Sequence, residues 1–272
     1  MRKFLQLFAI SIMLLSAFSS SIWAQDITVN IGHKASIQSA ILNETRTILI
    51  HLPNDYDTSK KSYPVLYRLD GDIDFLMETV STVNRLSLGD EIAPEMIIVA
   101  VENTNRAKDM WPTNTMYYPE PYTAGASDFL SFIEKELIPY VEDNYRTNKE
   151  KILCGQSLSA IFTMYAFLSK PKLFNSYIAI SGAFPGCEDY FTVLSEKSFQ
   201  QKDQFNGQSF FLTNGSKDPL DPDGELKKQI DDFSTTLIKS IGDKINFKYV
   251  TYENEGHVPF HSLYDGLKFI YE

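Results

Sequence analysis

The sequence predicts an α/β fold with a mostly parallel central sheet and helices on both faces. Short apolar runs alternate with longer amphipathic stretches, which is the rhythm of βαβ units. Of the 272 residues, 43% are hydrophobic and 22% are charged, a composition typical of a globular protein with a large core. Residues 25–272 contain no internal repeat and no linker, so we expect them to form a single domain.

The first elements of this domain are predicted to be strands. Residues 35–52 read as two antiparallel strands that turn at Asn43-Glu44. Residues 63–69 and 95–101 are almost continuously apolar and are expected as buried strands. A helix is expected at 75–86, between these two strands.

The later elements follow from the same two signals, an apolar run for a strand and a 3.6-residue period for a helix. Residues 103–122 contain three prolines and are expected to form a long, irregular surface loop, a kind of segment that is usually functional. Residues 126–145 carry an apolar stripe at helical spacing. The remaining strands are expected at 151–154, 176–180, 209–213 and 246–252, and the remaining helices at 158–168, 225–241 and 260–271, with short helices inside 185–208.

The N-terminus, residues 1–24, is predicted to be a cleaved signal peptide. Arg2 and Lys3 precede an apolar run at 4–18, and small residues ending at Ala24 follow. The run is short for a membrane span, although an uncleaved anchor is the alternative. No other stretch is long and apolar enough to cross a bilayer. We therefore expect a periplasmic or secreted protein without a membrane span in its mature chain.

Charge and cysteine content exclude several classes of partner. The formal charge is −10, and loss of Arg2 and Lys3 with the leader makes it −12. So acidic a protein repels phosphate backbones, so nucleic acid is not an expected partner. Two cysteines and four scattered histidines make no metal site, and no cofactor is expected. Cys154 and Cys187 can pair or remain free thiols, and the sequence leaves this choice and the oligomeric state open.

Ser157 is the candidate nucleophile. It lies in the segment Gly155-Gln156-Ser157-Leu158-Ser159, between a predicted strand and a predicted helix. A tight strand-to-helix turn raises a serine hydroxyl above the sheet edge, and it needs small flanking residues. The helix N-terminus favours negative charge, so the N–H of Leu158 is predicted to bind an oxyanion. The alternative is that Ser157 only caps the helix.

His257 is the predicted base, since a serine hydroxyl is a poor nucleophile without one. It follows a buried strand, as Ser157 does, and the carboxyl ends of parallel strands face the same crevice. His261, four residues on, is the alternative. His33 and His51 lie early in the chain, where structural roles are more common.

Asp218 is the predicted acid that orients the imidazole of His257, because it is the first acid after the strand at 209–213. The order Ser, Asp, His along the chain is that of α/β-hydrolases and differs from the order in chymotrypsin-like and subtilisin-like proteases. The sequence therefore predicts the α/β-hydrolase fold. The rival acids, at least one of which we expect to cap the next helix, are Asp221, Asp223 and Glu225.

Two further groups are expected at the mouth of this site. Gly71 lets the backbone turn tightly after the strand at 63–69, and the N–H of Asp72 is predicted to be the second oxyanion donor. Aromatic side chains offer a surface that suits an aryl acyl group, and Trp111 is the predicted substrate-binding member. The other aromatic candidates are Tyr117, Tyr118 and Phe184; the alternative for all four is that they only pack the loop.

Several segments together resemble the putative-esterase family, which groups esterase D, enterochelin-type siderophore esterases, feruloyl and acetyl-xylan esterases, and mycolyltransferases. The resemblance runs from about residue 45 to the C-terminus. The matching segments are 63–71, 97–101 with Asn103, Arg106 and Asp109 after it, 132–145, 155–159 and 255–257.

This resemblance implies a serine esterase with the same three catalytic roles. It also implies that Arg106 pairs with Asp109 to shape the loop beside the site, which makes Arg106 a candidate for substrate binding. One departure is visible: the family usually reads G-x-S-x-G-G at the elbow, whereas this chain has Ser159-Ala160.

The function predicted from the sequence is hydrolysis of a small-molecule carboxylic ester through an acyl-enzyme on Ser157. Siderophore trilactones and acylated plant carbohydrates are the candidate substrates. One alternative keeps the site but uses a sugar or alcohol acceptor, as an acyltransferase does. Another is a non-catalytic binding protein on a hydrolase scaffold.

Overall fold

The structure is a computed structural model that describes residues 29–114 and 123–272. The predicted signal peptide, 1–24, lies outside the described residues, as do Tyr117 and Tyr118. The account below concerns the unit Ile31–Glu272. In the part of the chain that the structure describes, no helix has the length and apolar character of a membrane span.

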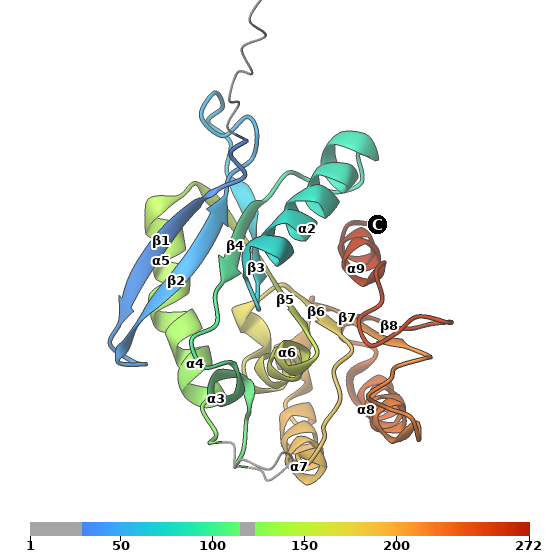
Figure 1. Cartoon of the computed structure of the whole chain (residues 1–272). Helices are drawn as coiled ribbons and strands as arrows, with labels where there is room; N and C mark the ends of the chain where they lie inside the picture. Colours follow the sequence, from blue (N-terminus) through green and yellow to red (C-terminus); the bar gives the residue numbers. More distant parts are fainter. Residues whose placement is uncertain (1–28, 115–122) are drawn as a thin grey trace, which may run out of the picture. The chain divides into compact units, whose positions relative to one another are not determined.

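A mixed sheet forms the centre of this unit, with its strands in the order β1-β2-β4-β3-β5-β6-β7-β8 (Figure 1). β1 and β2 form the expected antiparallel hairpin, and β2 pairs antiparallel with β4. All remaining neighbours are parallel. The strands are β1 His33–Ser39, β2 Glu44–His51, β3 Tyr63–Arg68, β4 Ile97–Val101, β5 Thr147–Gln156, β6 Ser176–Ile180, β7 Ser209–Gly215 and β8 Asn246–Tyr252.

Helices cover both faces of the sheet, as predicted (Figure 1). One face carries α2 (Ile73–Asn84) and α9 (Ser262–Tyr271), which pack on it through Leu76 and Leu267. The opposite face carries the larger apolar cluster. Its helices are α3 Arg106–Met110, α4 Ala126–Phe132, α5 Ile138–Asn144, α6 Leu158–Ser169, α7 Glu188–Phe199 and α8 Glu225–Ile241.

Short helical turns extend or join these helices. A π-helical turn prolongs α2, and a second one links α4 to α5, so that residues 126–144 form the single long helix expected from the sequence. The π turns are Arg85–Gly89 and Ile133–Leu137, and the 3₁₀ turns are Pro171–Leu173 and Lys202–Phe205.

The apolar runs of the sequence become strands because both faces of the sheet are covered. Val65 and Tyr67 of β3 belong to the larger apolar cluster, whereas Leu66 between them belongs to the other. A strand that is buried on both sides reads as a continuous hydrophobic run instead of an alternating one. All six residues of β3 are buried accordingly.

Apart from shifts of about two residues at element ends, the structure differs from the sequence predictions in three larger respects. β5 begins at Thr147, four residues early, because its polar first half lies at the exposed end of the sheet and carries no apolar signal. One helix, α7, fills most of the segment expected to hold short helices. The expected irregular loop contains α3, which begins where the Asn105 side chain accepts a hydrogen bond from the N–H of Lys108.

The topology brings four loops together at the carboxyl-terminal end of the parallel strands. The parallel strands β5 to β8 all end there, and ligands of open α/β sheets bind outside these carboxyl ends. Ser157 follows β5, Ser181 follows β6, Asp218 follows β7 and His257 follows β8.

Candidate active site

Ser157 occupies a tight turn between β5 and α6. Its φ is 53° and its ψ is −122°, in a region that residues with a Cβ rarely adopt, and its N–H donates to the Ile180 carbonyl at 2.8 Å. The turn is close enough that a Cβ added to Gly155 would lie 2.2 Å from the carbonyl oxygen of Ser159. The small flanking residue expected at 155 is therefore required by the backbone itself. Such strained turns are typical of functional sites.

Two hydrogen bonds connect Ser157, His257 and Asp218. Nε2 of His257 lies 2.8 Å from Oγ of Ser157, and Nδ1 lies 2.5 Å from Oδ2 of Asp218. The other carboxylate oxygen of Asp218 accepts the N–H of Leu220 at 2.8 Å, which fixes the carboxylate. The His257 and Asp218 side chains are 24% and 15% exposed, so solvent reaches the pair. The arrangement suits proton transfer from the hydroxyl to an oriented imidazole.

The rival histidines lie elsewhere in the described structure. His261 precedes α9 and lies beside the ring of Tyr252. Nε2 of His33 lies 3.0 Å from the hydroxyl of Tyr145, and Nδ1 of His51 lies 2.7 Å from the carbonyl of Ile31.

Asp221, the next acid after Asp218, caps α8. Its two carboxylate oxygens accept the N–H groups of Leu226 and Lys227 at 2.9 and 2.8 Å. This is the helix-capping role that the sequence assigned to at least one acid of this loop. Asp223 and Glu225 are exposed.

The two predicted oxyanion donors have different surroundings. Leu158 is the first residue of α6, where N–H groups have no acceptor within the helix. The N–H of Asp72, in contrast, already donates to the Asp70 carbonyl at 2.9 Å. Asp72 also caps α2, its side chain accepting the N–H of Phe75 at 3.0 Å. The start of α2 thus holds Asp72 in a turn of its own, and its role as the second oxyanion donor stays a prediction.

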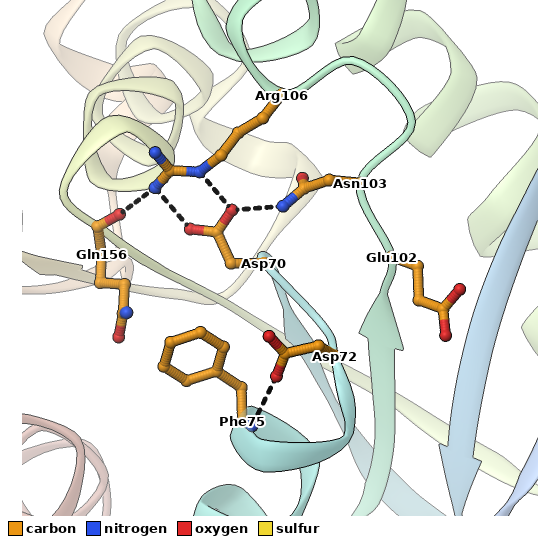
Figure 2. Close-up of a pocket in the computed structure, with 7 residues that line it drawn as sticks. All are labelled: Asp70, Asp72, Phe75, Glu102, Asn103, Arg106 and Gln156. Atoms are coloured by element: carbon orange, nitrogen blue, oxygen red, sulfur yellow. Dashed lines mark hydrogen bonds and ion pairs between the residues drawn. The ribbon is translucent and has the colours of Figure 1, made fainter.

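Arg106 pairs with Asp70, the residue after β3, and the expected pairing with Asp109 is wrong (Figure 2). Its Nε and Nη2 donate to the two carboxylate oxygens of Asp70 at 2.6 and 2.8 Å, and Nη2 lies 3.3 Å from the Gln156 carbonyl. Asp109, one turn further along α3, forms a buried ion pair with Arg46 of β2. The short helix α3 thus contributes to two different ion pairs.

Asp70 is a buried carboxylate with a full set of donors. Besides Arg106, it accepts hydrogen bonds from Asn103 Nδ2 at 2.7 Å and from the hydroxyl of Ser159 at 2.8 Å. Burial alone raises the pKa of Asp70, but the hydrogen bonds and charge of Arg106, with those of Asn103 and Ser159, outweigh it and lower the pKa below its ordinary value. Asp70 is therefore ionised at neutral pH.

Ser159, which stands where the family usually has glycine, adds hydrogen bonds at the elbow. Its hydroxyl donates to Asp70 and accepts the N–H of Gln156 at 2.7 Å. The elbow that carries Ser157 is thereby tied to the Asp70–Arg106 pair. The sequence showed only that residue 159 had to be small, and no local signal indicated its distant partner.

Two hollows meet at Arg106. The catalytic cavity, about 270 Å³, contains Ser157 and His257, and its apolar wall includes the predicted substrate-binding residue Trp111. The polar cavity, about 550 Å³, is lined by Asp70, Asp72, Glu102, Asn103, Gln156 and the ring of Phe75 (Figure 2). Arg106 lines both, and its role in substrate binding stays a prediction.

Phe184 does not reach the catalytic cavity. It is buried, with its ring stacked on that of Phe191 at a centroid distance of 4.1 Å, and it lines a separate hollow under α7 and α8. Its expected place at the mouth of the site is therefore wrong, because the loop after β6 folds it into the core.

Cys154 and Cys187 are buried free thiols. Burial raises the pKa of Cys187 to about 12, so it is not a reactive thiolate at neutral pH. Within residues 29–114 and 123–272, no group of three His, Cys, Asp or Glu side chains is arranged to hold a metal ion.

The fold and the arrangement of Ser157, His257 and Asp218 define an α/β-hydrolase. Comparison with known proteins identifies the family: the chain belongs to the family described as "Putative esterase", whose model matches residues 39–217. Curated relatives of the chain include proteins that are named as esterases.

Several relatives extend this comparison. The chain is 31% identical to an IroE-like serine hydrolase from Shewanella oneidensis, over 88% of this chain and 80% of that one, with a TM-score of 0.81. It is 31% identical over 156 residues to the ferri-bacillibactin esterase BesA of Bacillus subtilis. The siderophore hydrolase EstA from Aspergillus nidulans, at 20% identity and a TM-score of 0.74, shares the fold over 92% of this chain and 98% of its own. The match to BesA covers 50% of this chain and 54% of BesA, so the chain spans about half the length of the curated relatives it matches.

Proposed function

We infer that this protein is a serine carboxylic ester hydrolase that works through an acyl-enzyme. Ser157 is the nucleophile, His257 the general base and acid, and Asp218 the carboxylate that orients His257. The observation that carries this proposal is the pair of hydrogen bonds that joins the three side chains, 2.8 Å and 2.5 Å long. Their residues lie on three loops up to 100 positions apart, so proximity in the chain does not account for the arrangement.

The proposed acylation step begins when Oγ of Ser157 attacks the ester carbonyl carbon while Nε2 of His257 takes the hydroxyl proton. The carbonyl oxygen gains negative charge and accepts a hydrogen bond from the N–H of Leu158, where the α6 dipole also favours an anion. The C–O bond to the alcohol then breaks, and His257 returns its proton to the leaving oxygen.

Deacylation repeats these steps with water as the nucleophile. His257 takes a proton from the water, whose oxygen attacks the acyl carbon, and then protonates Oγ of Ser157 as the acid is released. Throughout, Asp218 holds Nδ1–H and stabilises the imidazolium. No cofactor enters the proposed reaction.

Siderophore esters are the first candidate substrates, because BesA and EstA, among the relatives, are named for hydrolysing siderophores. Acylated carbohydrates are the second candidate. The proposed site of action is the periplasm or the exterior of the cell, and the sequence of residues 1–24 is its only support.

The test is a kinetic screen with 4-nitrophenyl esters of increasing acyl length. We expect measurable hydrolysis of short chains and a loss of about 10³-fold or more in Ser157→Ala. His257→Ala should lose a similar factor, whereas His261→Ala, its matched control, should stay within about threefold. Asp218→Asn should lose activity and Asp221→Asn should retain it, since Asp221 serves α8. Equal rates for Ser157→Ala and the unaltered protein would overturn the proposal.

A further inference from the structure

Besides Arg106, which is paired with Asp70, the catalytic cavity contains a polar group that the proposed reaction leaves unused. It is Ser181, the residue after β6, which lines this cavity together with Ser157 and His257. Ser181 is 5% exposed, and its hydroxyl oxygen is buried without a hydrogen-bond partner. A buried, unpaired hydroxyl is costly, so its presence in a folded protein requires an explanation.

The backbone at Ser181 carries a second cost. Its φ is 54°, in the left-handed region that glycine adopts freely and a residue with a Cβ does not. The segment is nevertheless held firmly: the N–H of Ser181 donates to the Thr213 carbonyl at 2.7 Å, and a Cβ on Gly182 would lie 2.9 Å from Sδ of Met164. A serine is thus kept in a strained conformation between β7 and α6, at a position where glycine would carry no strain.

Strain and an unpaired polar group together are typical of a binding site. The neighbouring wall of the catalytic cavity is apolar and includes Ile161, Ala183 and Pro185. In a mostly apolar pocket, a single placed polar group sets specificity, because a ligand that cannot pair with it leaves it buried and unsatisfied. Rotation about the Cα–Cβ bond takes a serine hydroxyl through three staggered positions, which lets the oxygen turn toward a ligand.

The proposed reaction indicates which part of the substrate stays near Ser181. β6 neighbours β5 on the side opposite β3, and thus lies on the same side of Ser157 as β8 and His257. In the proposed reaction the acyl group stays bonded to Oγ of Ser157 in the intermediate, while the alcohol departs. The acyl group is therefore the part of the substrate that stays in the cavity lined by both Ser157 and Ser181.

We propose that Ser181 is a specificity-determining residue whose hydroxyl pairs with a polar substituent on the acyl group, so that the enzyme prefers hydroxy- or acylamino-acid esters to plain alkyl esters. This inference rests on the proposed function, since it requires an acyl group on Ser157. It assigns Ser181 a contact with substrate and no part in proton transfer.

The test compares three esters with the same leaving group: 4-nitrophenyl butanoate, 4-nitrophenyl 3-hydroxybutanoate and the 4-nitrophenyl ester of N-acetylglycine. The unaltered enzyme should turn over at least one polar ester with a kcat/KM about 10- to 100-fold above that of the butanoate, the factor that pairing one buried hydroxyl supplies. In Ser181→Ala this preference should fall below about threefold.

Ser195→Ala is the matched control. Ser195 of α7 also has a buried hydroxyl without a partner, but it lies outside the catalytic cavity, so its removal should leave the preference intact. The melting temperature separates specificity from structure. Ser181→Gly removes both the unpaired hydroxyl and the backbone strain, so it should raise Tm by about 2–4 °C. It should also abolish the preference for the polar esters, whereas replacing a serine with a purely structural role would leave that preference unchanged.

Two results would overturn the inference. One is a kcat/KM for the butanoate that equals or exceeds the values for both polar esters. The other is a preference for the polar esters that survives in Ser181→Ala and Ser181→Gly. Either result, with hydrolysis still dependent on Ser157, leaves the proposed function standing. If the unaltered protein hydrolyses none of the esters, or if hydrolysis persists in Ser157→Ala, the proposed function is refuted instead.

Discussion

Asp70→Asn removes the charge at the centre of the network that holds the nucleophile elbow. The carboxylate accepts hydrogen bonds from Arg106, Asn103 and Ser159, and its side chain is 6% exposed. An asparagine keeps one acceptor oxygen but presents an N–H₂ group to donors on its other side. The substitution therefore removes the counter-ion of Arg106 and turns one acceptor of the network into a donor group.

The expected cost is about 2–3 kcal/mol. Removal of one partner of a fully buried ion pair costs about 3–5 kcal/mol. Arg106 is 38% exposed, so water can solvate part of its freed charge, and the lower figure applies. For a domain of this size, such a loss lowers Tm by about 4–12 °C. We also expect a lower kcat, because Arg106 and Ser159 both contact the backbone of Gln156, the residue before the nucleophile.

The stability difference between the unaltered protein and Asp70→Asn should depend on pH in a defined direction. The pKa of Asp70 is lower in the folded protein than its ordinary value, so the stability it contributes is present above about pH 4 and is lost as the pH falls through the folded pKa. The gap in stability between the unaltered protein and Asp70→Asn should accordingly be full at pH 7 and shrink below pH 4.

The assay is urea unfolding at a series of pH values, monitored by circular dichroism, with Asp72→Asn as the control. Asp72 is exposed, and asparagine can still accept the N–H of Phe75, so the control should change stability by less than about 0.5 kcal/mol. A stability of Asp70→Asn within about 0.5 kcal/mol of the unaltered protein at pH 7 would refute the reasoning. So would a gap that widens in acid.

Two further substitutions test the elbow and the loop after β7. Gly155→Ala places a Cβ 2.2 Å from the Ser159 carbonyl oxygen, so we expect a loss of more than about 2 kcal/mol in urea unfolding and a lower kcat; a fully active, stable variant would contradict this geometry. Asp221→Ala removes the side chain that accepts two N–H groups of α8, and it should cost about 1 kcal/mol in the same assay while kcat/KM stays within about twofold. A large loss of activity with unchanged stability would give Asp221 the role proposed for Asp218.

The sequence predicted the strands and most helices because both signals were strong. The strand at 176–180 and the helices that pack on the sheet read directly as apolar runs or as a 3.6-residue period. The polar start of β5 was missed because it carries neither signal, although it pairs with β3. Boundaries that tertiary pairing sets cannot be found from local periodicity.

Some residues of the candidate site could likewise be predicted from the sequence, and others could not. Ser157 and His257 could be singled out because each follows a strand end, and the topology then brings such residues to one crevice. The partner of Arg106 could not be found, because it depends on the tertiary packing that brings Asp70, 36 residues away in the chain, beside α3. Ser181 carried no sequence signal: its unpaired hydroxyl and its positive φ are properties of the folded chain alone.

The most direct test of the central claim is site mapping of a covalent inhibitor. A fluorophosphonate should phosphonylate Oγ of Ser157, and mass spectrometry of the digested protein should find the adduct on the peptide that contains this residue. Labelling should slow by at least about 10²-fold in His257→Ala and stay unchanged in His261→Ala. An adduct on another residue, or labelling of Ser157 at the same rate without His257, would contradict the account.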